Sequence, residues 1–325
     1  MPWASDPNSS AGVWDEPAAS AFRYTECMPR ETLVPVSGPF QWERTLAFAR
    51  QQNAHDVRVE GHAEASWESV VALPDGGSVA VAAYGFSAGI RVRSAASDPV
   101  RHGAAVKRVA WRFSVAADAA AFYARVRQDP QFGPLAARWW GIRPVRDASP
   151  WVALARLILG QQVSVASHRT LVNRLLTGWG HAAVTPSGAR VVAWPTPQDL
   201  AGETVGELVA GGIPRRPATT LQLAARWAAA GVLEGTAADA AQRLEELPGI
   251  GPWTAAGVRL FGWGDDDALM ASDLVLRKAA AALANAGRPF TAPELERWLE
   301  PYHPYRGWVG YLLWHEPLAD VAGPR

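Results

Sequence analysis

The feature that most constrains this chain is a pair of glycines that flank one apolar residue. They lie in the segment Leu247-Pro248-Gly249-Ile250-Gly251-Pro252. Glycine accepts positive φ and has no Cβ, so the segment predicts a tight turn in which Ile250 plugs into the helices beneath. One helix should end near Leu247 and the next should begin near Pro252, a residue favoured in a first helical turn. The free amides of the second helix would then point outward as an anion site. An ordinary helix–helix corner with a glycine cap is the alternative.

Asp273 is the second constraint. It follows Gly251 by 22 residues (273 − 251) and precedes an apolar helical stripe formed by Leu276, Ala279, Ala280 and Leu283. This position predicts the N-cap of that helix. Because a helix N-terminus also favours a negatively charged side chain, capping is compatible with a catalytic role for the same carboxylate. With the hairpin at this spacing, we predict that Asp273 is catalytic.

Cys27 is the only cysteine among the 325 residues, which excludes internal disulfides, a cysteine-ligated zinc site and a four-thiolate iron–sulfur cluster. The histidines show no metal-ligand spacing. Asp265-Asp266-Asp267 suggests a metal site or, more simply, a solvated acidic loop. No apolar run approaches about 18 residues, and no basic segment followed by an apolar core opens the chain. We therefore expect no side-chain metal site, no membrane span and a cytoplasmic protein.

The formal net charge is +0, so any affinity for nucleic acid has to come from a local patch. Of the 31 basic residues only Lys107 and Lys278 are lysines, which leaves 29 arginines (31 − 2). A coding bias toward arginine explains this simply. Arg259 and Arg277 are candidates for contacts with backbone phosphates, with a solvated surface position as the alternative.

Three regions of the chain differ in pattern, which predicts an α+β protein. Residues 1–37 are rich in Ser, Pro, Ala and charge without periodicity, which predicts a mobile tail. Residues 38–114 predict a small antiparallel α+β domain. Residues 115–325 predict an all-α domain. Its joints are marked by Pro and Gly at Pro195–Pro197, Gly211–Pro214 and Gly287–Pro289.

Within residues 38–114, helical spacing predicts one short helix and alternation predicts strands. The turn signal Pro74-Asp75-Gly76-Gly77 would join two of the strands. The helix would carry Trp42, Leu46 and Ala49, and the strands would cover Val57 and Val59, Trp67–Leu73, Ser78–Tyr84, Ile90 and Val92, and finally Val109, Trp111 and Phe113.

Together with these features, four segments resemble the helix-hairpin-helix DNA glycosylases that have a Gly/Pro-rich loop and a catalytic Asp, and most of all their AlkA-like 3-methyladenine DNA glycosylase II branch. The resemblance covers residues 38–316 and leaves the tail outside it. The segments are Ile158-Leu159-Gly160-Gln161-Gln162-Val163-Ser164-Val165, Pro195-Thr196-Pro197-Gln198-Asp199-Leu200, the hairpin with Trp253, and Ala271-Ser272-Asp273.

The resemblance implies a TBP-like N-terminal unit followed by a two-lobed helical domain that flips a damaged nucleotide into the cleft between the lobes. Asp273 would stabilise the oxocarbenium-like sugar and orient the attacking water. Trp253 and Trp314 match aromatic walls of the base pocket, where a cationic ring would stack on indole. Gln162 matches the side chain inserted into the gap in the duplex, with a surface position at a helix joint as the alternative. The hairpin residues expected at DNA are Leu247, Gly249, Ile250, Gly251 and Thr254.

Two departures from the family pattern bear on the lesion. Leu274 follows Asp273, and Gly257 lies four residues after Trp253, where the best-known members carry aromatic residues. These changes predict a roomier or less stacking pocket.

The scarcity of lysine bears on strand cleavage, because relatives that also cut the strand need an amine for a Schiff base. Trp253 occupies the position of that lysine. Lys278 is five residues past Asp273 and so points off its face. We therefore expect base excision without lyase cutting.

The sequence thus predicts a monofunctional glycosylase for alkylated purines in base excision repair, acting as a monomer on double-stranded DNA with a damaged base. No organic cofactor is expected, and the resemblance allows a monovalent cation at the hairpin carbonyls. Two other functions stay open: a non-catalytic module that binds damaged DNA, and a glycosylase for another lesion such as an oxidised or deaminated base.

Overall fold

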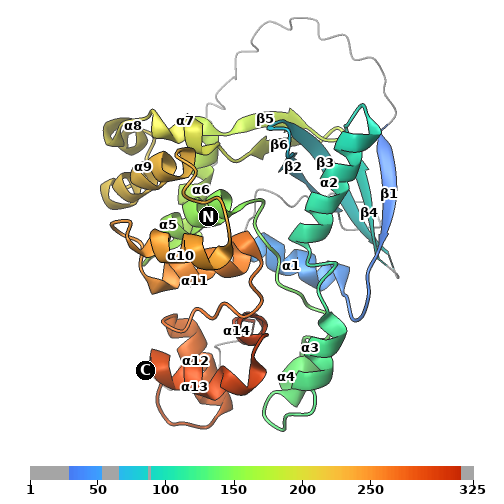
Figure 1. Ribbon diagram of the computed structural model, residues 1–325, viewed down its shortest axis with the longest axis vertical. Coiled ribbons are helices and arrows are strands. Elements are labelled where there is room, and N and C mark those ends of the chain that lie inside the picture. The colour runs from blue at the N-terminus through green and yellow to red at the C-terminus, as the bar shows by residue number, and fades with distance from the viewer. Residues whose placement is uncertain (1–28, 53–65, 87–88, 316–325) are drawn as a thin grey trace, which may run out of the picture.

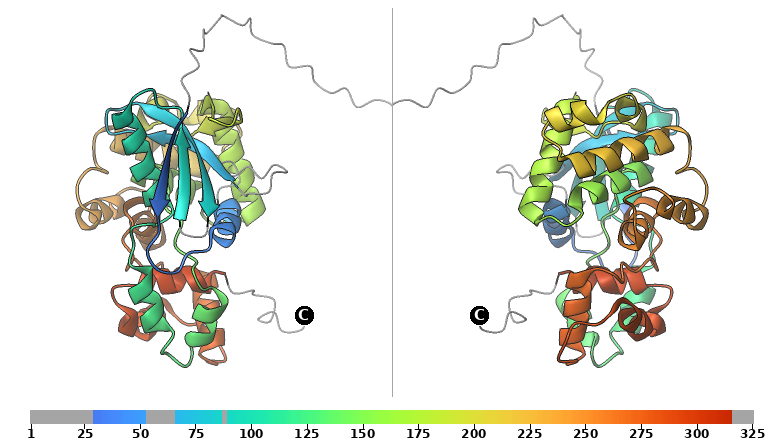
Figure 2. Two further views of the ribbon diagram at one scale, coloured as in Figure 1. Left: turned by 90° about the vertical axis from the view of Figure 1, so that its right-hand side faces the viewer. Right: turned by 90° about the vertical axis from the view of Figure 1, so that its left-hand side faces the viewer.

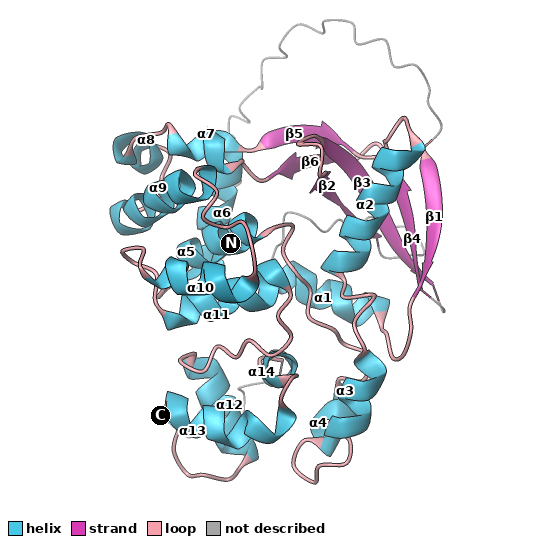
Figure 3. Cartoon of the chain, viewed as in Figure 1, coloured by secondary structure: helices cyan, strands magenta, loops and turns pink. Residues whose placement is uncertain are grey.

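The computed structural model describes residues 29–52, 66–86 and 89–315. A four-stranded antiparallel sheet lies on one side of the molecule, and most of the helices lie beside and below it, as Figure 3 shows. The α+β class predicted from the sequence is confirmed. The elements in chain order are β1 (Arg30–Pro35), α1 (Trp42–Gln52), β2 (Ser66–Ala72), β3 (Ser78–Phe86), β4 (Gly89–Ser94), α2 (Pro99–Arg112), α3 (Ala119–Val126), α4 (Gly133–Arg138), α5 (Pro150–Gly160), α6 (Val165–Trp179), β5 (His181–Val184), β6 (Arg190–Ala193), α7 (Pro197–Ala201), α8 (Val205–Ala210), α9 (Arg215–Ala229), α10 (Ala237–Glu245), α11 (Pro252–Val258), the π-helix η1 (Arg259–Trp263), α12 (Leu274–Leu283), α13 (Ala292–Leu299), the 3₁₀ helix η2 (Glu300–Tyr302) and α14 (Arg306–Leu313).

The sheet has the strand order β1-β4-β3-β2. The predicted turn at residues 74–77 joins β2 to β3, and β4 occupies the predicted Ile90–Val92 segment. The first strand corrects the prediction of a mobile tail, since Arg30–Pro35 pairs with β4 along its whole length. The expected strand at Val57 and Val59 lies outside the described residues.

The predicted last strand of this domain is wrong. Val109, Trp111 and Phe113 belong to α2 and its C-cap, which lie across the sheet (Figure 1). The buried residues of α2 recur every three or four positions, and Asp98 caps the helix by accepting from the amide of Arg101. Three alternating apolar residues are too few to distinguish a strand from a helix. Here Val109 and Phe113 are buried, and Trp111 lies on the partly exposed face of the helix.

The helical region has two lobes. In Figure 1, α5 to α11 form one lobe, while α12, α13 and α14 lie beside α3 and α4 in the other. Aromatic contacts join these distant segments: the rings of Phe122 and Trp308 lie 4.9 Å apart, and those of Phe132 and Tyr302 lie 4.8 Å apart. The two views in Figure 2 show the same grouping.

One β-hairpin interrupts the domain that was predicted to be all-α. Strands β5 and β6 pair with each other and pack on β2 of the sheet. The buried carboxylate of Glu68 on β2 accepts hydrogen bonds from Thr185 and from Ser187, the latter at 2.6 Å. The hairpin therefore fastens the sheet to the helical lobe. No helix in the described ranges has the length and apolarity to cross a membrane.

Candidate functional site

The glycine hairpin forms where the sequence predicts it, between α10 and α11. Gly249 has a φ of +92°, and a Cβ there would lie 2.5 Å from Thr220 Oγ1, so this position needs glycine for two reasons. Gly251, in contrast, is extended at a φ of −114° with open space where its Cβ would be. The positive φ expected in this turn is therefore found at Gly249 and not at Gly251. Gly251 instead leaves the surface at the start of α11 without a side chain.

The hairpin presents main-chain amides outward and buries its side chains. Leu247 and Ile250 are buried, as plugs between α10 and α11. Gly251 is the N-cap of α11 and offers no side chain to the first-turn amides. Those amides are therefore available to an anion. Leu247 and Ile250 can serve DNA binding only by holding this backbone in place.

Gln161 fixes the hairpin to the end of α5, a role that the sequence did not predict. Its Nε2 donates to the carbonyl of Gly249 at 2.9 Å and to Thr254 Oγ1 at 3.0 Å. Thr254 is only 2% exposed, and its hydroxyl serves this internal bond. The signal was the pair of adjacent glutamines at the α5–α6 joint, of which only Gln162 was singled out.

Asp273 caps α12, as predicted, and two tryptophans hold its carboxylate. Oδ1 accepts from the amide of Leu276 at 2.9 Å and from Trp314 Nε1 at 3.2 Å. Oδ2 accepts from Trp253 Nε1 at 2.8 Å. Three donors, from α11, from α12 and from the residue that follows α14, thus fix both oxygens of one carboxylate. The structure brings together the predicted catalytic residue and both predicted aromatic walls.

A pocket of about 240 Å³ opens beside this carboxylate, between the two helical lobes. Asp273, Trp253 and Trp314 all line it, and the other lining residues come from α5, the α5–α6 joint, α6, the π-helix η1 and the loop before α12. These are Arg156, Leu157, Gly160, Val163, Val165, His168, Phe261 and Met270.

The deep wall of the pocket is a stack of planar groups. Trp314 stacks on Phe261 with centroids 5.9 Å apart and planes 15° apart. The guanidinium of Arg156 covers the same phenyl ring at 5.0 Å and forms a buried ion pair with Asp147, with Nη2 and Oδ2 2.7 Å apart. Phe261 belongs to the π-helix η1, a rare conformation often found at functional sites. The plane of Trp314 is therefore fixed at its face by Phe261 and at its edge by Asp273.

His168 adds an uncharged group to this wall. Its Nε2 lies 3.1 Å from the carbonyl of Arg156, and burial lowers the pKa of the imidazole to about 4. The ring is therefore neutral near pH 7. Since Asp147 neutralises Arg156, the charge that is left facing the pocket is the carboxylate of Asp273.

Comparison with known proteins agrees with this geometry. No family model matches the chain. A sequence relative from Mycobacterium tuberculosis, described as a probable bifunctional transcriptional activator/DNA repair enzyme AlkA, is 31% identical over 61% of this chain and 40% of its own length. The chain thus spans less than half of that relative. DNA-3-methyladenine glycosylase 2 of Escherichia coli is 27% identical over 85% of this chain and 94% of its own.

The solved structures give the same result for the fold. A 3-methyladenine DNA-glycosylase from Archaeoglobus fulgidus superposes with a TM-score of 0.77 at 22% identity, covering 90% of this chain and 98% of its own. An 8-oxoguanine glycosylase/lyase from Clostridium acetobutylicum follows with a TM-score of 0.67 at 15% identity, over 89% and 98%. In sequence and in fold, the chain resembles the helix-hairpin-helix DNA glycosylases, and among them the AlkA-like branch.

Exposed apolar side chains lie on two segments next to the pocket: Val163 and Val165 on one, and Leu274 and Val275 on the other. These four residues are called the apolar lips. Val163 and Val165 are 40% and 61% exposed on the α5–α6 joint, and Leu274 and Val275 are 50% and 36% exposed at the start of α12. Gln162, next to the first pair, is exposed with a φ of +56°. Exposed apolar side chains gathered at one opening indicate a surface that is covered in use.

The two departures from the superfamily pattern have different structural meanings. Leu274 lies on the rim and does not line the pocket. Gly257 is buried against α5, and a Cβ there would lie 2.8 Å from Leu157 and 3.0 Å from Met270. Because Leu157 and Met270 occupy this space, the expected enlargement of the pocket at Gly257 does not occur.

The charged residues singled out in the sequence mostly bind one another. Each acid of the loop forms an ion pair: Asp265 with Arg259, Asp266 with Arg146, and Asp267 with Arg306. The three carboxylates are therefore neutralised by arginines, and the loop is not simply a solvated acidic loop. Arg277 donates to the carbonyl of Phe290 at 3.2 Å. Arg259 and Arg277 are thus occupied internally, contrary to the role expected at phosphates. No cluster of potential metal ligands exists among the described residues.

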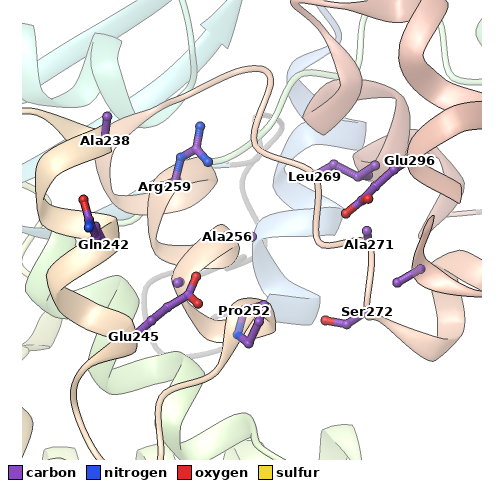
Figure 4. A pocket seen from close by; sticks show the side chains of 12 residues that line it. Ala238, Gln242, Glu245, Pro252, Ala256, Arg259, Leu269, Ala271, Ser272 and Glu296 are labelled. Carbon is purple, nitrogen blue, oxygen red and sulfur yellow. The ribbon is translucent and has the colours of Figure 1, made fainter.

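A larger hollow lies on the other side of α11 from the base pocket. It measures about 720 Å³ and lies between α10, α11 and α13 (Figure 4). Glu245 and Glu296 line it, together with the Arg259 that pairs with Asp265. Two carboxylates make this hollow unsuited to a phosphate backbone. The site with the carboxylate and indoles is therefore the candidate site.

Proposed function

We propose that this protein is a monofunctional DNA glycosylase that releases alkylated purines from double-stranded DNA. The observation that carries the proposal is the carboxylate of Asp273, fixed by Trp253, Trp314 and the amide of Leu276 in a pocket between two lobes. The relatives named for 3-methyladenine support the substrate class. Such an enzyme would act as a monomer on chromosomal DNA in the cytoplasm.

The chemistry follows from the charges in the pocket. A nucleotide turned out of the duplex would place its base against Trp253 and Trp314 and its sugar next to Asp273. As the glycosidic bond breaks, the carboxylate would stabilise the positive charge that develops on the sugar and orient the attacking water. An alkylated purine already carries positive charge, so it leaves without a strong general acid. His168 supports this view because burial lowers its pKa to about 4, so the ring is an uncharged imidazole and a poor general acid near pH 7.

The hairpin would hold the DNA by its backbone. The bare N-terminus of α11 at Gly251 suits a phosphate oxygen, and the exposed Gln162 with the apolar lips would enter the gap left by the flipped base. A monovalent cation at the hairpin would have to share carbonyls, because those of Leu247 and Gly249 already accept from Ile250 and Gln161.

The absence of a lysine from the pocket lining, within the described part of the chain, supports hydrolysis without strand cleavage. By the family resemblance, Trp253 stands where a Schiff-base lysine would be expected, and its indole donates to Asp273. Abasic sites would therefore accumulate as the product.

A panel of duplexes, each with one lesion, tests this function. Methylated purines, hypoxanthine, uracil and 8-oxoguanine are incubated with the protein and then treated with or without alkali. We expect strand breaks only after alkali and mainly with methylated purines. Breaks without alkali would contradict the monofunctional mechanism. If the protein releases one of the other bases and no methylated purine, the proposed substrate is wrong. Tight binding with no base release from any duplex would favour the non-catalytic damage-binding module.

A further inference from the structure

Helix α9 begins next to the glycine hairpin. Thr220, in its second turn, faces Gly249 so closely that a Cβ on Gly249 would lie 2.5 Å from Thr220 Oγ1. In Figure 1, α9 lies in the same lobe as α10 and α11. Whatever the hairpin binds therefore lies within reach of long side chains at the start of α9.

Two arginines open this helix and are exposed to solvent. Within the described ranges, Arg215 and Arg216 make no side-chain hydrogen bond, ion pair or ring contact, a condition shared by only a few arginines such as Arg190. Arg259 and Arg277, the arginines that the sequence suggested for phosphates, are engaged internally. In a chain of net charge +0, these two guanidiniums are thus a local source of positive charge beside the hairpin.

Helical geometry places Arg216 on the hairpin side. It precedes Thr220 by four residues, so the two side chains lie on one face about one turn apart. The Arg216 side chain leans toward the N-terminus of α9 and is long enough to pass the exposed Gly249 backbone.

The loop that leads into α9 and its two arginines is held in place. Arg174 on α6 donates to the carbonyl of Gly212 at 2.7 Å, and Gly212 has a φ of +88° with the Arg174 side chain packed against it. This order lowers the entropic cost of binding a ligand at Arg215 and Arg216.

We propose that Arg216, assisted by Arg215, binds a backbone phosphate next to the one held by the hairpin amides, so that α9 and α11 grip one DNA strand together. The inference rests on the proposed function. A guanidinium matches the geometry of two phosphate oxygens with a pair of parallel hydrogen bonds. Contacts of this kind fix the position of the strand and do not select the base.

The salt dependence of DNA binding tests this proposal. The full chain and its Arg216→Gln, Arg215→Gln and double variants are titrated with labelled duplexes, with and without a lesion, by fluorescence anisotropy at several salt concentrations. Arg190→Gln on β6 is the matched control, since Arg190 is also exposed and without a side-chain contact. For Arg216→Gln we expect the slope of log K against log salt to become shallower by about 0.9, the value for one lost phosphate contact. Arg215→Gln should give a smaller change in the same direction.

The affinity should fall several-fold, and by the same factor on damaged and undamaged duplexes, because phosphates are common to both. A slope equal to that of Arg190→Gln would overturn the proposal, and so would a loss confined to the damaged duplex. These outcomes are separate from the proposed chemistry, because they are measured on binding alone. A protein that binds with the predicted salt slopes but releases no base would leave the phosphate grip standing and the glycosylase function refuted.

Discussion

Trp253 Nε1 lies 2.8 Å from Oδ2 of Asp273, so the indole that should form a wall for the base also positions the carboxylate. Trp314 makes the same kind of bond to Oδ1 at 3.2 Å. Each tryptophan therefore has two separable roles, one through its ring face and one through its nitrogen.

Replacing Trp253 by Phe keeps an aromatic face and removes the donor. A hydrogen bond to a charged group contributes about 1.5–3 kcal/mol, so we expect single-turnover base release to slow by about tenfold to hundredfold. Trp314→Phe should have a smaller effect, because its bond is longer and Leu276 still holds Oδ1. Trp227→Phe on α9, away from the pocket, is the control. Equal rates for Trp253→Phe and this control would refute the positioning role.

The two hairpin glycines should respond differently to alanine. Gly249→Ala introduces a Cβ at positive φ and against Thr220, so we expect the free energy of unfolding to fall by about 1–3 kcal/mol. Gly251→Ala has room for the methyl group and should leave stability nearly unchanged, yet weaken DNA binding because the methyl lies where the phosphate approaches the amides. Urea unfolding and anisotropy measure the two effects separately. Unchanged DNA affinity of Gly251→Ala would count against this phosphate site.

The apolar lips should matter for opening the duplex. We expect Val165→Ser and Leu274→Ser to slow base release from duplex DNA by about tenfold, since unstacking a base step costs a few kcal/mol that an apolar wedge offsets. On a lesion placed in a single strand, the same variants should be close to wild type. Val184→Ser on β5 removes a valine of 46% exposure far from the pocket and is the matched control. The same slowing on single strands would mean that the lips act on chemistry instead.

The buried imidazole of His168 makes stability depend on pH. Its pKa is lowered by burial to about 4 in the folded protein, whereas an unfolded histidine titrates near about 6.5. The unfolded state therefore binds the proton first, and the contribution of His168 to stability is complete above about pH 6.5 and is lost as the pH falls toward 4. We expect the free energy of unfolding of wild type to drop by on the order of 2 kcal/mol more than that of His168→Gln between pH 7 and pH 4. Parallel urea-unfolding curves for the two proteins across this range would refute the assignment.

What could be predicted from the sequence is local. Gly249 at a positive φ, Pro252 in a first turn and Asp273 as N-cap each depend on a few neighbouring residues, and the structure has all three. The α+β class and the β2–β3 turn are predictable for the same reason.

What was missed depends on contacts between residues far apart in the sequence. Arg30–Pro35 becomes a strand only because β4 offers it an edge, and β5 and β6 form against β2. Trp111 looked like a strand residue because its alternation is short, while the packing of α2 over the sheet decides the helix. Neither the Gln161 bond to Gly249, across 88 residues, nor the pairing of Asp267 with Arg306 has a local signal.

Single-turnover base release from a methylated duplex by wild type and Asp273→Asn tests the central claim most directly. The amide oxygen of asparagine can still accept from Leu276 and Trp314, while its NH2 group cannot accept from Trp253. The N-cap of α12 and the shape of the side chain are kept, so the fold should persist while the negative charge is lost. With enzyme in excess over DNA, we predict that the variant binds the duplex as wild type does and releases methylated purine at least about a hundredfold more slowly. Equal release rates for the two proteins would show that the carboxylate of Asp273 does not drive the reaction.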